Sequence, residues 1–370
     1  MSFSADLFAR YHSLVVFAAI FFTAVIFTWL ARRIAVALNI VDRPVSVRKI
    51  HENSIPLLGG IAIFFAFFSG LWIMKDRLLS GNLEPGHFMG FFSGALILMI
   101  GGFLDDKYDL KPGKQIIFPA LAALAVIAGG VGIEKITNPF GGLILLDAFK
   151  IPVFAYEGIT HYFVLVSDLF VFFWLMGMMY TTKILDGLDG LVTGVTAIGS
   201  FIIFLFTMTT KYYQPDVGLA ALILSAACLG FLVFNWHPAK IFLGEGGSLF
   251  LGYALGTLAI ISGGKIAIAL LILGIPIMDV VWAIIRRTRA GKNPFKFSDR
   301  EHLHHRILDL GFGQRKTVLI YYFLSAAFGL SALFLQSRGK IVALAVLAMI
   351  MFLVVAGFGR LDSNVKIKNN

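Results

Sequence analysis

Apolar runs of about 20 residues recur along the whole chain, and short polar segments separate them. A helix of that length crosses the roughly 30 Å hydrocarbon core of a bilayer with its backbone hydrogen bonds satisfied internally. Hydrophobic residues make up 58% of the 370 positions and charged residues only 14%, well below the roughly 25% charged residues of soluble globular chains. The sequence therefore predicts an all-α polytopic membrane protein, with residues 1–370 forming one membrane domain.

Charges, glycines and prolines bound eleven apolar segments. If all eleven cross the bilayer, the loops of one side and the C-terminal tail hold 22 of the 31 Lys and Arg residues. Basic residues accumulate on the cytoplasmic side, so we expect the N-terminus outside and the C-terminus in the cytoplasm. Residues 362–370 are expected to form a disordered tail. The predicted spans are 14–33, 57–74, 89–104, 116–133, 163–182, 191–210, 217–235, 247–263, 266–286, 317–336 and 340–358.

The net charge of +10 is explained by basic cytoplasmic loops, which anionic lipid attracts. No aromatic and basic nucleic-acid module is visible, so membrane lipid is an expected partner and nucleic acid is not. The single cysteine, Cys228, excludes a disulfide framework within one chain. On the outer side we expect a short hairpin around Leu143–Val153 and no functional site.

Two adjacent carboxylates, Asp105 and Asp106, stand where an apolar segment meets the cytoplasm. Adjacent like charges are unfavourable unless they share something cationic. This pair is typical of a metal site or of a catalytic base beside a partner that shifts its pKa. The alternative is a solvated helix end that Lys107 neutralises.

Two Asp-Gly pairs in tandem, at Asp186 and Asp189, join one apolar segment directly to the next. Non-helical polar backbone at membrane depth is tolerated only where it is buried in protein or lines a wet cavity. Ionisable residues in such a place indicate a functional site. A purely structural turn is the alternative.

A glycine-rich turn at Phe242–Ser248 opens a further apolar segment and contains Glu245. Backbone amides at a helix N-terminus favour a phosphate, and Glu245 is placed to hold a cation that bridges to it. The alternative is a tight turn between helices with Ser248 as its cap.

Two basic loops lie on the same predicted side. The loop at Asp42–Gly60 contains Lys49 and His51, and it attracts either a phosphorylated ligand or lipid headgroups. The loop at 286–306 combines arginines with a histidine cluster suited to phosphate, although the arginines alone would fit a positive-inside loop. All five polar segments share one side, which indicates a common site. The cluster comprises His302, His304, His305 and Arg306.

In this order the segments resemble the polyprenyl-phosphate N-acetylhexosamine-1-phosphate transferase family. The His-x-His-His-Arg motif is similar to the N-acetylglucosamine-type branch. The resemblance covers about residues 14–336, and the ordered set of motifs is much more specific than any one of them. The motifs are Asp42–Gly60, Asp105–Leu110, Asp186–Leu191, Phe242–Ser248, Asp279 and His302–Arg306.

The resemblance implies transfer of a sugar 1-phosphate, an N-acetylhexosamine 1-phosphate, from a UDP-sugar to polyprenyl (undecaprenyl) phosphate. UMP is released, and lipid-linked cell-envelope glycan synthesis begins. The resemblance also implies a location in the inner (plasma) membrane, with the active site facing the cytoplasm. Because two polyanions must meet, positioning and cations are expected to carry the catalysis.

The same resemblance implies roles for individual residues. Asp105 activates the lipid phosphate, Asp106 organises a cation, and both Asp186 and Asp189 orient the nucleotide or the metal. The residues implied to bind substrate are Lys49, His51, Lys183, Gly246, Ser248, His302, His304, His305 and Arg306.

Two of the motifs depart from the family pattern. The family usually has Asn where this chain has Lys183, often has Asn at Tyr180, and usually has Asp at Glu245. The resemblance implies Mg²⁺, with Mn²⁺ as the alternative, held by Asp106 and Glu245. A protonated lysine cannot ligate Mg²⁺. We therefore hypothesise that Lys183 supplies a fixed positive charge at or beside the metal position, paired with Glu245.

Two other functions compete with the transferase. A lipid-phosphate or sugar-phosphate transporter would place ionisable groups near the midplane or on both sides, usually within repeats, and no repeat is evident. An inactive relative that binds lipid phosphate is the other alternative. The sugar, the polyprenol, the downstream glycan and the oligomeric state stay open, with a homodimer as one option.

Overall fold

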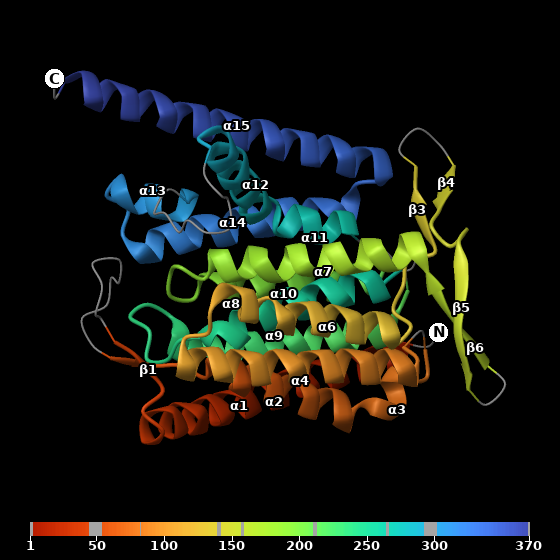
Figure 1. Cartoon of the computed structure of the whole chain (residues 1–370). Helices are drawn as coiled ribbons and strands as arrows, with labels where there is room; N and C mark the ends of the chain where they lie inside the picture. The colour runs from red at the N-terminus through yellow and green to blue at the C-terminus, as the bar shows by residue number, and fades with distance from the viewer. Residues whose placement is uncertain are drawn as a thin grey trace.

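The computed structural model describes residues 3–43, 54–81, 83–138, 142–156, 159–209, 213–263, 266–291 and 302–368. Long helices dominate this part of the chain and run side by side, as Figure 1 shows. The helices are α1 (Phe3–Ala37), α2 (Gly59–Ile73), α3 (Lys75–Leu78), α4 (Pro85–Tyr108), α5 (Pro112–Gln115), α6 (Ile117–Ala128), α7 (Leu165–Leu185), α8 (Leu191–Thr207), α9 (Pro215–Asn235), α10 (Gly244–Ile261), α11 (Ile266–Ile272), α12 (Gly274–Arg289), α13 (Leu303–Asp309), α14 (Gln314–Phe334) and α15 (Ser337–Lys368).

Every predicted span overlaps a helix. Within the described residues, six helices are long and apolar enough to cross a membrane, and a seventh span results if α11 and α12 are counted together. Three shorter apolar helices cover the predicted spans near 57–74, 116–133 and 191–210. The chain is therefore a mostly helical, multi-pass membrane protein, and the number eleven stays a prediction. Helix α15 continues to Lys368 and so covers most of the segment predicted to be a disordered tail.

The predicted span 266–286 is not one straight helix. It divides at Leu273 into α11 and α12, which are bent by 78° relative to each other. Pro276 has no N–H to donate to the carbonyl four residues earlier, which breaks the helical ladder at this point. Gly274 meanwhile lets α15 approach, because a Cβ there would lie 2.7 Å from a methyl carbon of Leu347.

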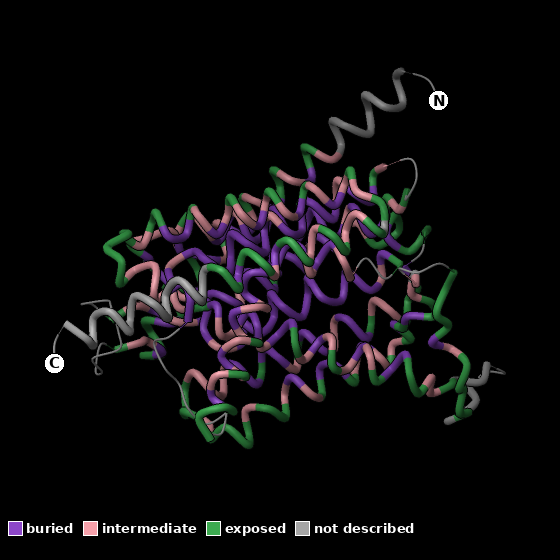
Figure 2. The backbone as a smooth tube through the Cα atoms, turned by 90° about the horizontal axis from the view of Figure 1, so that it is seen from above, coloured by how far each residue is buried: buried purple, intermediate pink, exposed green. Residues whose placement is uncertain are grey.

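The centre of the bundle is α10. Of its span 89% is buried inside the protein, against 28% for α1. Gly252 lets α7 pack directly against this helix, since a Cβ at that position would lie 2.3 Å from the carbonyl oxygen of Met178. Figure 2 shows buried residues along the inner helices and exposed residues on the periphery. Many peripheral side chains are large and apolar, such as Phe22, Phe173 and Phe323, as expected of a lipid-facing surface.

The two ends of the bundle differ. At one end, α4 and α7 finish and α8 and α10 begin; we call this the acidic end. The opposite, hairpin end carries strands β3 (Lys135–Thr137), β4 (Leu143–Leu145), β5 (Lys150–Tyr156) and β6 (Ile159–Val164). Helix α1 starts at the hairpin end and α15 finishes at the acidic end (Figure 1).

The predicted hairpin around Leu143–Val153 is wrong in its pairing. Strand β4 pairs antiparallel with β3, and β5 pairs antiparallel with β6, so two hairpins replace one. The prediction joined the second strand of one hairpin to the first strand of the next. The cause is that the apolar residues of β4 and β5 lie close together in sequence.

Candidate active site

The acidic end is held together by glycines that bring backbones into contact. A Cβ on Gly60 would lie 2.1 Å from the Cα of Gly247, and a Cβ on Gly102 would lie 2.1 Å from the Cα of Gly246. Only glycine allows such an approach. The start of α2, the last turns of α4 and the start of α10 therefore meet at one junction.

Two short strands, β1 (Val41–Asp42) and β2 (Ile55–Pro56), lead into this junction and pair antiparallel. The amides of Gly59 and Gly60 donate to the carbonyls of Phe242 and Leu243, at 2.9 and 2.8 Å. Backbone hydrogen bonds from the start of α2 thereby hold the glycine-rich turn in place.

The glycine-rich turn packs against its neighbours. Its Glu245 amide donates to Asp106 Oδ1 at 3.0 Å, so a carboxylate of the protein already accepts from this helix N-terminus. Gly246 is buried against α4, and the Ser248 hydroxyl donates to the Glu245 carbonyl of its own helix at 3.0 Å. Packing accounts for Gly246 and Ser248, and their substrate-binding role stays a prediction.

The carboxylate of Asp105 anchors the loop that follows α4. It accepts hydrogen bonds from the Leu110 amide at 2.8 Å and from Gln115 Nε2 at 3.0 and 3.1 Å. These donors engage both of its oxygens. The geometry therefore gives Asp105 an anchoring role, and the predicted role as base stays a prediction.

Lys183, near the end of α7, meets the acidic residues of other helices. Its ammonium contacts Glu245 Oε1 as an ion pair and donates to Gln115 Oε1 at 3.3 Å. The side chains of Lys183 and Glu245 are 25% and 21% exposed, so a ligand can reach both. Gln115, which is not among the predicted site residues, thus connects Asp105 to Lys183.

The tandem Asp-Gly turn places Asp186 and Asp189 between α7 and α8. The Asp186 residue is exposed at the mouth of the site, although protein atoms surround its carboxylate densely enough to displace water. This desolvation, together with the negative charges of Glu245, Asp189 and Asp106, raises the pKa of Asp186 to about 8. Within the described residues no hydrogen-bond donor engages its carboxylate, so Asp186 is open to a ligand.

The other half of the turn is fixed by its neighbours. Gly190 takes a left-handed conformation, with φ of +78°, at the start of α8. Its amide donates to Asn235 Oδ1 at 3.1 Å, and its carbonyl accepts from the Tyr322 hydroxyl at 2.6 Å. The Asp189 carboxylate accepts from the Ala239 amide at 3.1 Å, which orients it toward the segment after α9.

His237 joins the site through Asp189. Its Nδ1 lies 2.7 Å from Asp189 Oδ2, and its carbonyl accepts from Arg315 Nε at 3.0 Å. The imidazole side chain is 37% exposed, which leaves Nε2 available to a ligand. His237 is not among the predicted site residues. The available signal was its place in a His-Pro pair directly before the glycine-rich turn.

The histidine cluster approaches the Asp-Gly turn from α13. Asp279 holds the start of this helix: its carboxylate lies 2.9 Å from His302 Nδ1 and accepts from the Leu303 amide at 3.0 Å. His304 is 1% exposed, and neither ring nitrogen has a hydrogen-bond partner. Burial and the neighbouring imidazoles lower its pKa well below the usual value. A Cβ on Gly187 would lie 2.5 Å from His304 Nε2.

Gly246 and Ser248 pack within the glycine-rich turn, and His302 is held by Asp279; the other predicted site residues divide into three groups. The four aspartates, Lys183, Glu245 and His304 converge at the acidic end, while His305 and Arg306 lie half-buried on the same short helix, α13. Lys49 and His51 lie outside the described residues.

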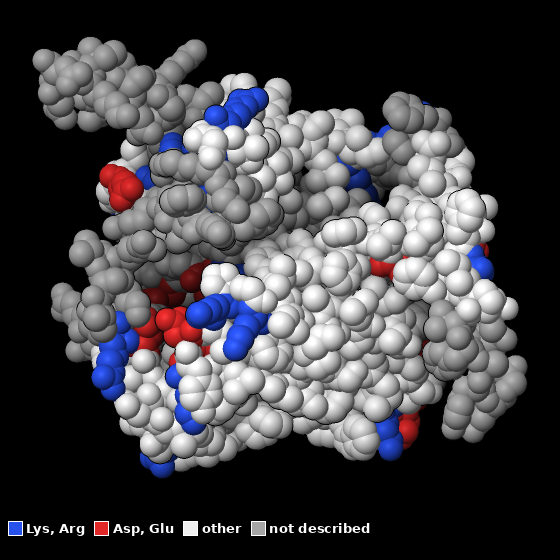
Figure 3. Space-filling view, viewed as in Figure 1, with Lys and Arg blue, Asp and Glu red and all other residues white. Residues whose placement is uncertain are grey.

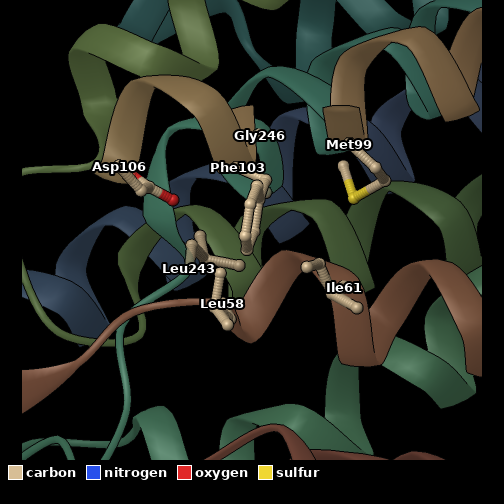
Figure 4. A pocket seen from close by; sticks show the side chains of 8 residues that line it. Leu58, Ile61, Met99, Phe103, Asp106, Leu243 and Gly246 are labelled. Carbon is tan, nitrogen blue, oxygen red and sulfur yellow. The ribbon is translucent and has the colours of Figure 1, made fainter. Parts of the chain in front are cut away.

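The surface reflects this convergence. Figure 3 shows acidic side chains gathered in a hollow at the acidic end, with Lys and Arg around its rim. Beside the hollow, a small crevice between α2, α4 and α10 is lined by Asp106 and by apolar side chains that include Leu58, Phe103 and Leu243. Figure 4 shows the Asp106 carboxylate at one end of this crevice, with Ile61 and Met99 farther along. A charged group thus borders an apolar surface.

The two implied metal ligands do not fit a divalent ion by themselves. Asp106 already accepts from the Glu245 amide, and the Glu245 carboxylate is paired with the ammonium of Lys183. In the part of the chain that the structure describes, no group of three His, Cys, Asp or Glu residues is placed to hold a metal ion. A protonated amine adds positive charge and no ligand.

Known proteins match most of this chain. The sequence model of glycosyl transferase family 4 matches residues 88–263, which include the four aspartates, Lys183 and Glu245. The probable undecaprenyl-phosphate N-acetylglucosaminyl 1-phosphate transferase of Bacillus subtilis (strain 168) is 33% identical over 329 residues, which cover 87% of this chain and 85% of that protein.

Two further relatives also match most of the chain. A decaprenyl-phosphate N-acetylglucosaminephosphotransferase of Mycobacterium tuberculosis (strain ATCC 25618 / H37Rv) is 29% identical, covering 81% of this chain and 78% of its own. A phospho-N-acetylmuramoyl-pentapeptide-transferase of Desulforamulus reducens is 31% identical, covering 76% and 82%. These matches confirm the resemblance found in the ordered motifs, and the chain belongs to glycosyl transferase family 4.

Proposed function

We propose that this protein transfers an N-acetylhexosamine 1-phosphate from a UDP-sugar to polyprenyl phosphate and releases UMP. One observation carries the proposal: a relative named for this activity is 33% identical over 87% of the chain. The aspartates of the site fall within the part of this chain that matches the family. No observation favours the transporter, because the clustered carboxylates of the site gather at one end of the bundle.

The reaction joins two phosphates. A phosphate oxygen of the lipid attacks the sugar-bearing phosphorus, and the bond to the UMP oxygen breaks, so UMP leaves with the bonding electrons. Both reactants are anions, and the enzyme must position them in line and offset their repulsion. We place the lipid phosphate beside Asp106, because apolar side chains of α2 and α4 border its carboxylate.

The residues of the site then take the following roles. Asp186 has an open carboxylate and faces the substrate phosphates, together with any cation that they carry. Asp189 orients His237, whose exposed ring contacts a phosphate oxygen. His304 covers the Asp-Gly turn from α13, and with Arg306 of the same helix it contacts the diphosphate or the sugar.

The same proposal includes a topology. Eleven spans place the N-terminus outside and the acidic end in the cytoplasm of the inner (plasma) membrane, where nucleotide sugars are available. The excess of Lys and Arg on that side supports this orientation. Cysteine-accessibility labelling of single cysteines, placed near residue 111 and near residue 145 in a Cys228→Ala background, tests it in intact cells. Labelling of the first position by an impermeant reagent would contradict it.

The activity is tested with purified protein in lipid nanodiscs that contain undecaprenyl phosphate. Radiolabelled UDP-N-acetylglucosamine and other UDP-sugars are supplied in turn, with and without Mg²⁺. We expect labelled lipid and UMP in equal amounts from at least one sugar, and neither product without lipid phosphate. Binding of the lipid phosphate without product from any UDP-sugar would instead identify an inactive relative.

A further inference from the structure

The ammonium of Lys183 is held from three directions inside the carboxylate cluster. It is paired with Glu245 of α10, it donates to Gln115 Oε1 at 3.3 Å, and it lies 5.8 Å from the centre of the Tyr180 ring. Ion pairing, a hydrogen bond and a cation–π contact each fix its position. The ammonium is therefore held in one place within the carboxylate cluster.

This position is also where the negative charge is densest. Asp106 touches the Glu245 amide, and Asp105 shares Gln115 with Lys183. Glu245, Gln115 and Asp105 together line a small crevice between α4, the start of α6 and α10. An ammonium has three N–H donors, and Glu245 and Gln115 engage two of them here, so the third is available to an anion.

We propose that Lys183 is a built-in cation of the diphosphate site, which binds a phosphate oxygen of the sugar nucleotide and takes the place of a resident divalent ion. This inference rests on the proposed function. Glu245 holds the ammonium in place, and its longer side chain spans the distance from α10 to α7. The two departures from the family pattern are therefore in direct contact and compensate each other.

A fixed ammonium changes what the site requires. It screens the repulsion between the diphosphate and the lipid phosphate at any metal concentration, because it is tethered to α7. It also repels a divalent cation from Glu245. The protein alone is thus expected to bind UDP without added metal and to bind Mn²⁺ only weakly.

The first experiment compares UDP binding with and without divalent ions, using purified wild-type protein and isothermal titration calorimetry in EDTA or in Mg²⁺. Wild type is expected to bind UDP in the two conditions with affinities that agree within about threefold, since a charge-assisted contact is already present without metal. Lys183→Asn is expected to lose about ten- to a hundredfold in EDTA. Lys107→Asn removes an exposed charge at the same end and is expected to bind like wild type.

The second experiment measures metal binding directly. Mn²⁺ electron paramagnetic resonance is recorded for wild type, for Lys183→Asn and for Lys183→Asn/Glu245→Asp, without nucleotide. The double variant is expected to gain a Mn²⁺ site that wild type lacks, and its lipid product is expected to depend on Mg²⁺ far more than that of wild type.

The outcomes separate the two proposals. If wild type binds UDP only with Mg²⁺, or if Mn²⁺ binds wild type and the double variant equally, Lys183 is not the cation of the site. If no UDP-sugar yields lipid product under any metal condition, the proposed reaction fails. The UDP and Mn²⁺ measurements still decide the role of Lys183 in that case, because neither needs turnover.

Discussion

The two ends of the bundle use carboxylates in opposite ways. At the hairpin end, two buried acids of the described part of the chain accept from backbone amides: Asp168 accepts from Val164 at 2.8 Å, and Asp216 accepts from Leu83 at 3.1 Å. These acids fix the entry into α7 and α9, and they lie apart from one another. At the acidic end, carboxylates from α4, the Asp-Gly turn and α10 converge, with Lys183 among them.

This difference indicates which acids serve the fold and which serve a ligand. An acid that caps a backbone amide stabilises the fold by itself. Acids that crowd together repel one another, and the fold holds them there only if something positive, such as a bound cation or a basic ligand, offsets the repulsion. Asp105 is intermediate, because it anchors a loop while belonging to the cluster.

The largest effect is expected from a comparison in which one acid at each end is replaced by its amide. Asp186→Asn and Asp168→Asn are both isosteric, but only the first removes an open carboxylate of the site. Asp186→Asn is expected to lower the rate of lipid product formation by about 10²–10⁴-fold. Asp168→Asn keeps an acceptor oxygen for the Val164 amide and is expected to retain both activity and stability. Equal rates for the two variants would remove the distinction between the ends.

The glycine junction of the acidic end is tested by adding a methyl group. Gly60→Ala would place its Cβ 2.1 Å from the Cα of Gly247, whereas Gly177→Ala in α7 meets no atom within 4 Å. We expect Gly60→Ala to lower the free energy of unfolding by about 1–3 kcal/mol or more, because the contact is backbone to backbone. Gly177→Ala is the control. Thermal stability in detergent measures both, and equal melting temperatures would show that α2 and α10 can separate without cost.

A smaller effect on activity is expected at His237, which the cluster holds through Asp189. His237→Ala removes a ring whose Nδ1 lies 2.7 Å from Asp189 and whose other nitrogen is open to a phosphate. The rate of product formation is expected to fall by about ten- to a hundredfold, which corresponds to one charge-assisted hydrogen bond. His87→Ala, at the hairpin end, is the matched control, because that imidazole only contacts the start of α4 and the Gly130 carbonyl. An unchanged rate in His237→Ala would assign the Asp189–His237 pair to the fold alone.

The sequence predicts the helices well, because a bilayer requires each spanning segment to satisfy its own backbone. It also predicts which end carries the chemistry, since alternating spans sort the polar loops by side. The bend at Leu273 was not predicted, although Pro276 is a recognisable signal for it. Strand pairing at the hairpin end was predicted wrongly because register depends on contacts that no local pattern records.

Within the site, residue types were predictable and partners were not. Lys183 and Glu245 were expected to pair because each departs from the family pattern, and the structure places them in contact. Gln115 and His237 were not expected. Their importance arises from bonds to Asp105 and Asp189, and in both pairs the two residues are separated in the sequence. The role of Gly246 in packing likewise depends on a glycine of α4.

The smallest expected effect is the pH dependence that desolvation and charge crowding give to the ligand-free protein, because solvent screens the exposed Asp186. Folding raises the pKa of Asp186 from 3.8 to about 8, so between these values the folded state binds more protons than the unfolded state. The free energy of unfolding should therefore fall as the pH rises from about 4 to about 8, and should then level off. Asp186→Asn removes this titration, and its melting temperature should depend less on pH over the same range. If wild type and the variant have parallel pH profiles, then the neighbouring carboxylates do not crowd Asp186 in the folded protein, and the acidic end differs from the hairpin end in position only.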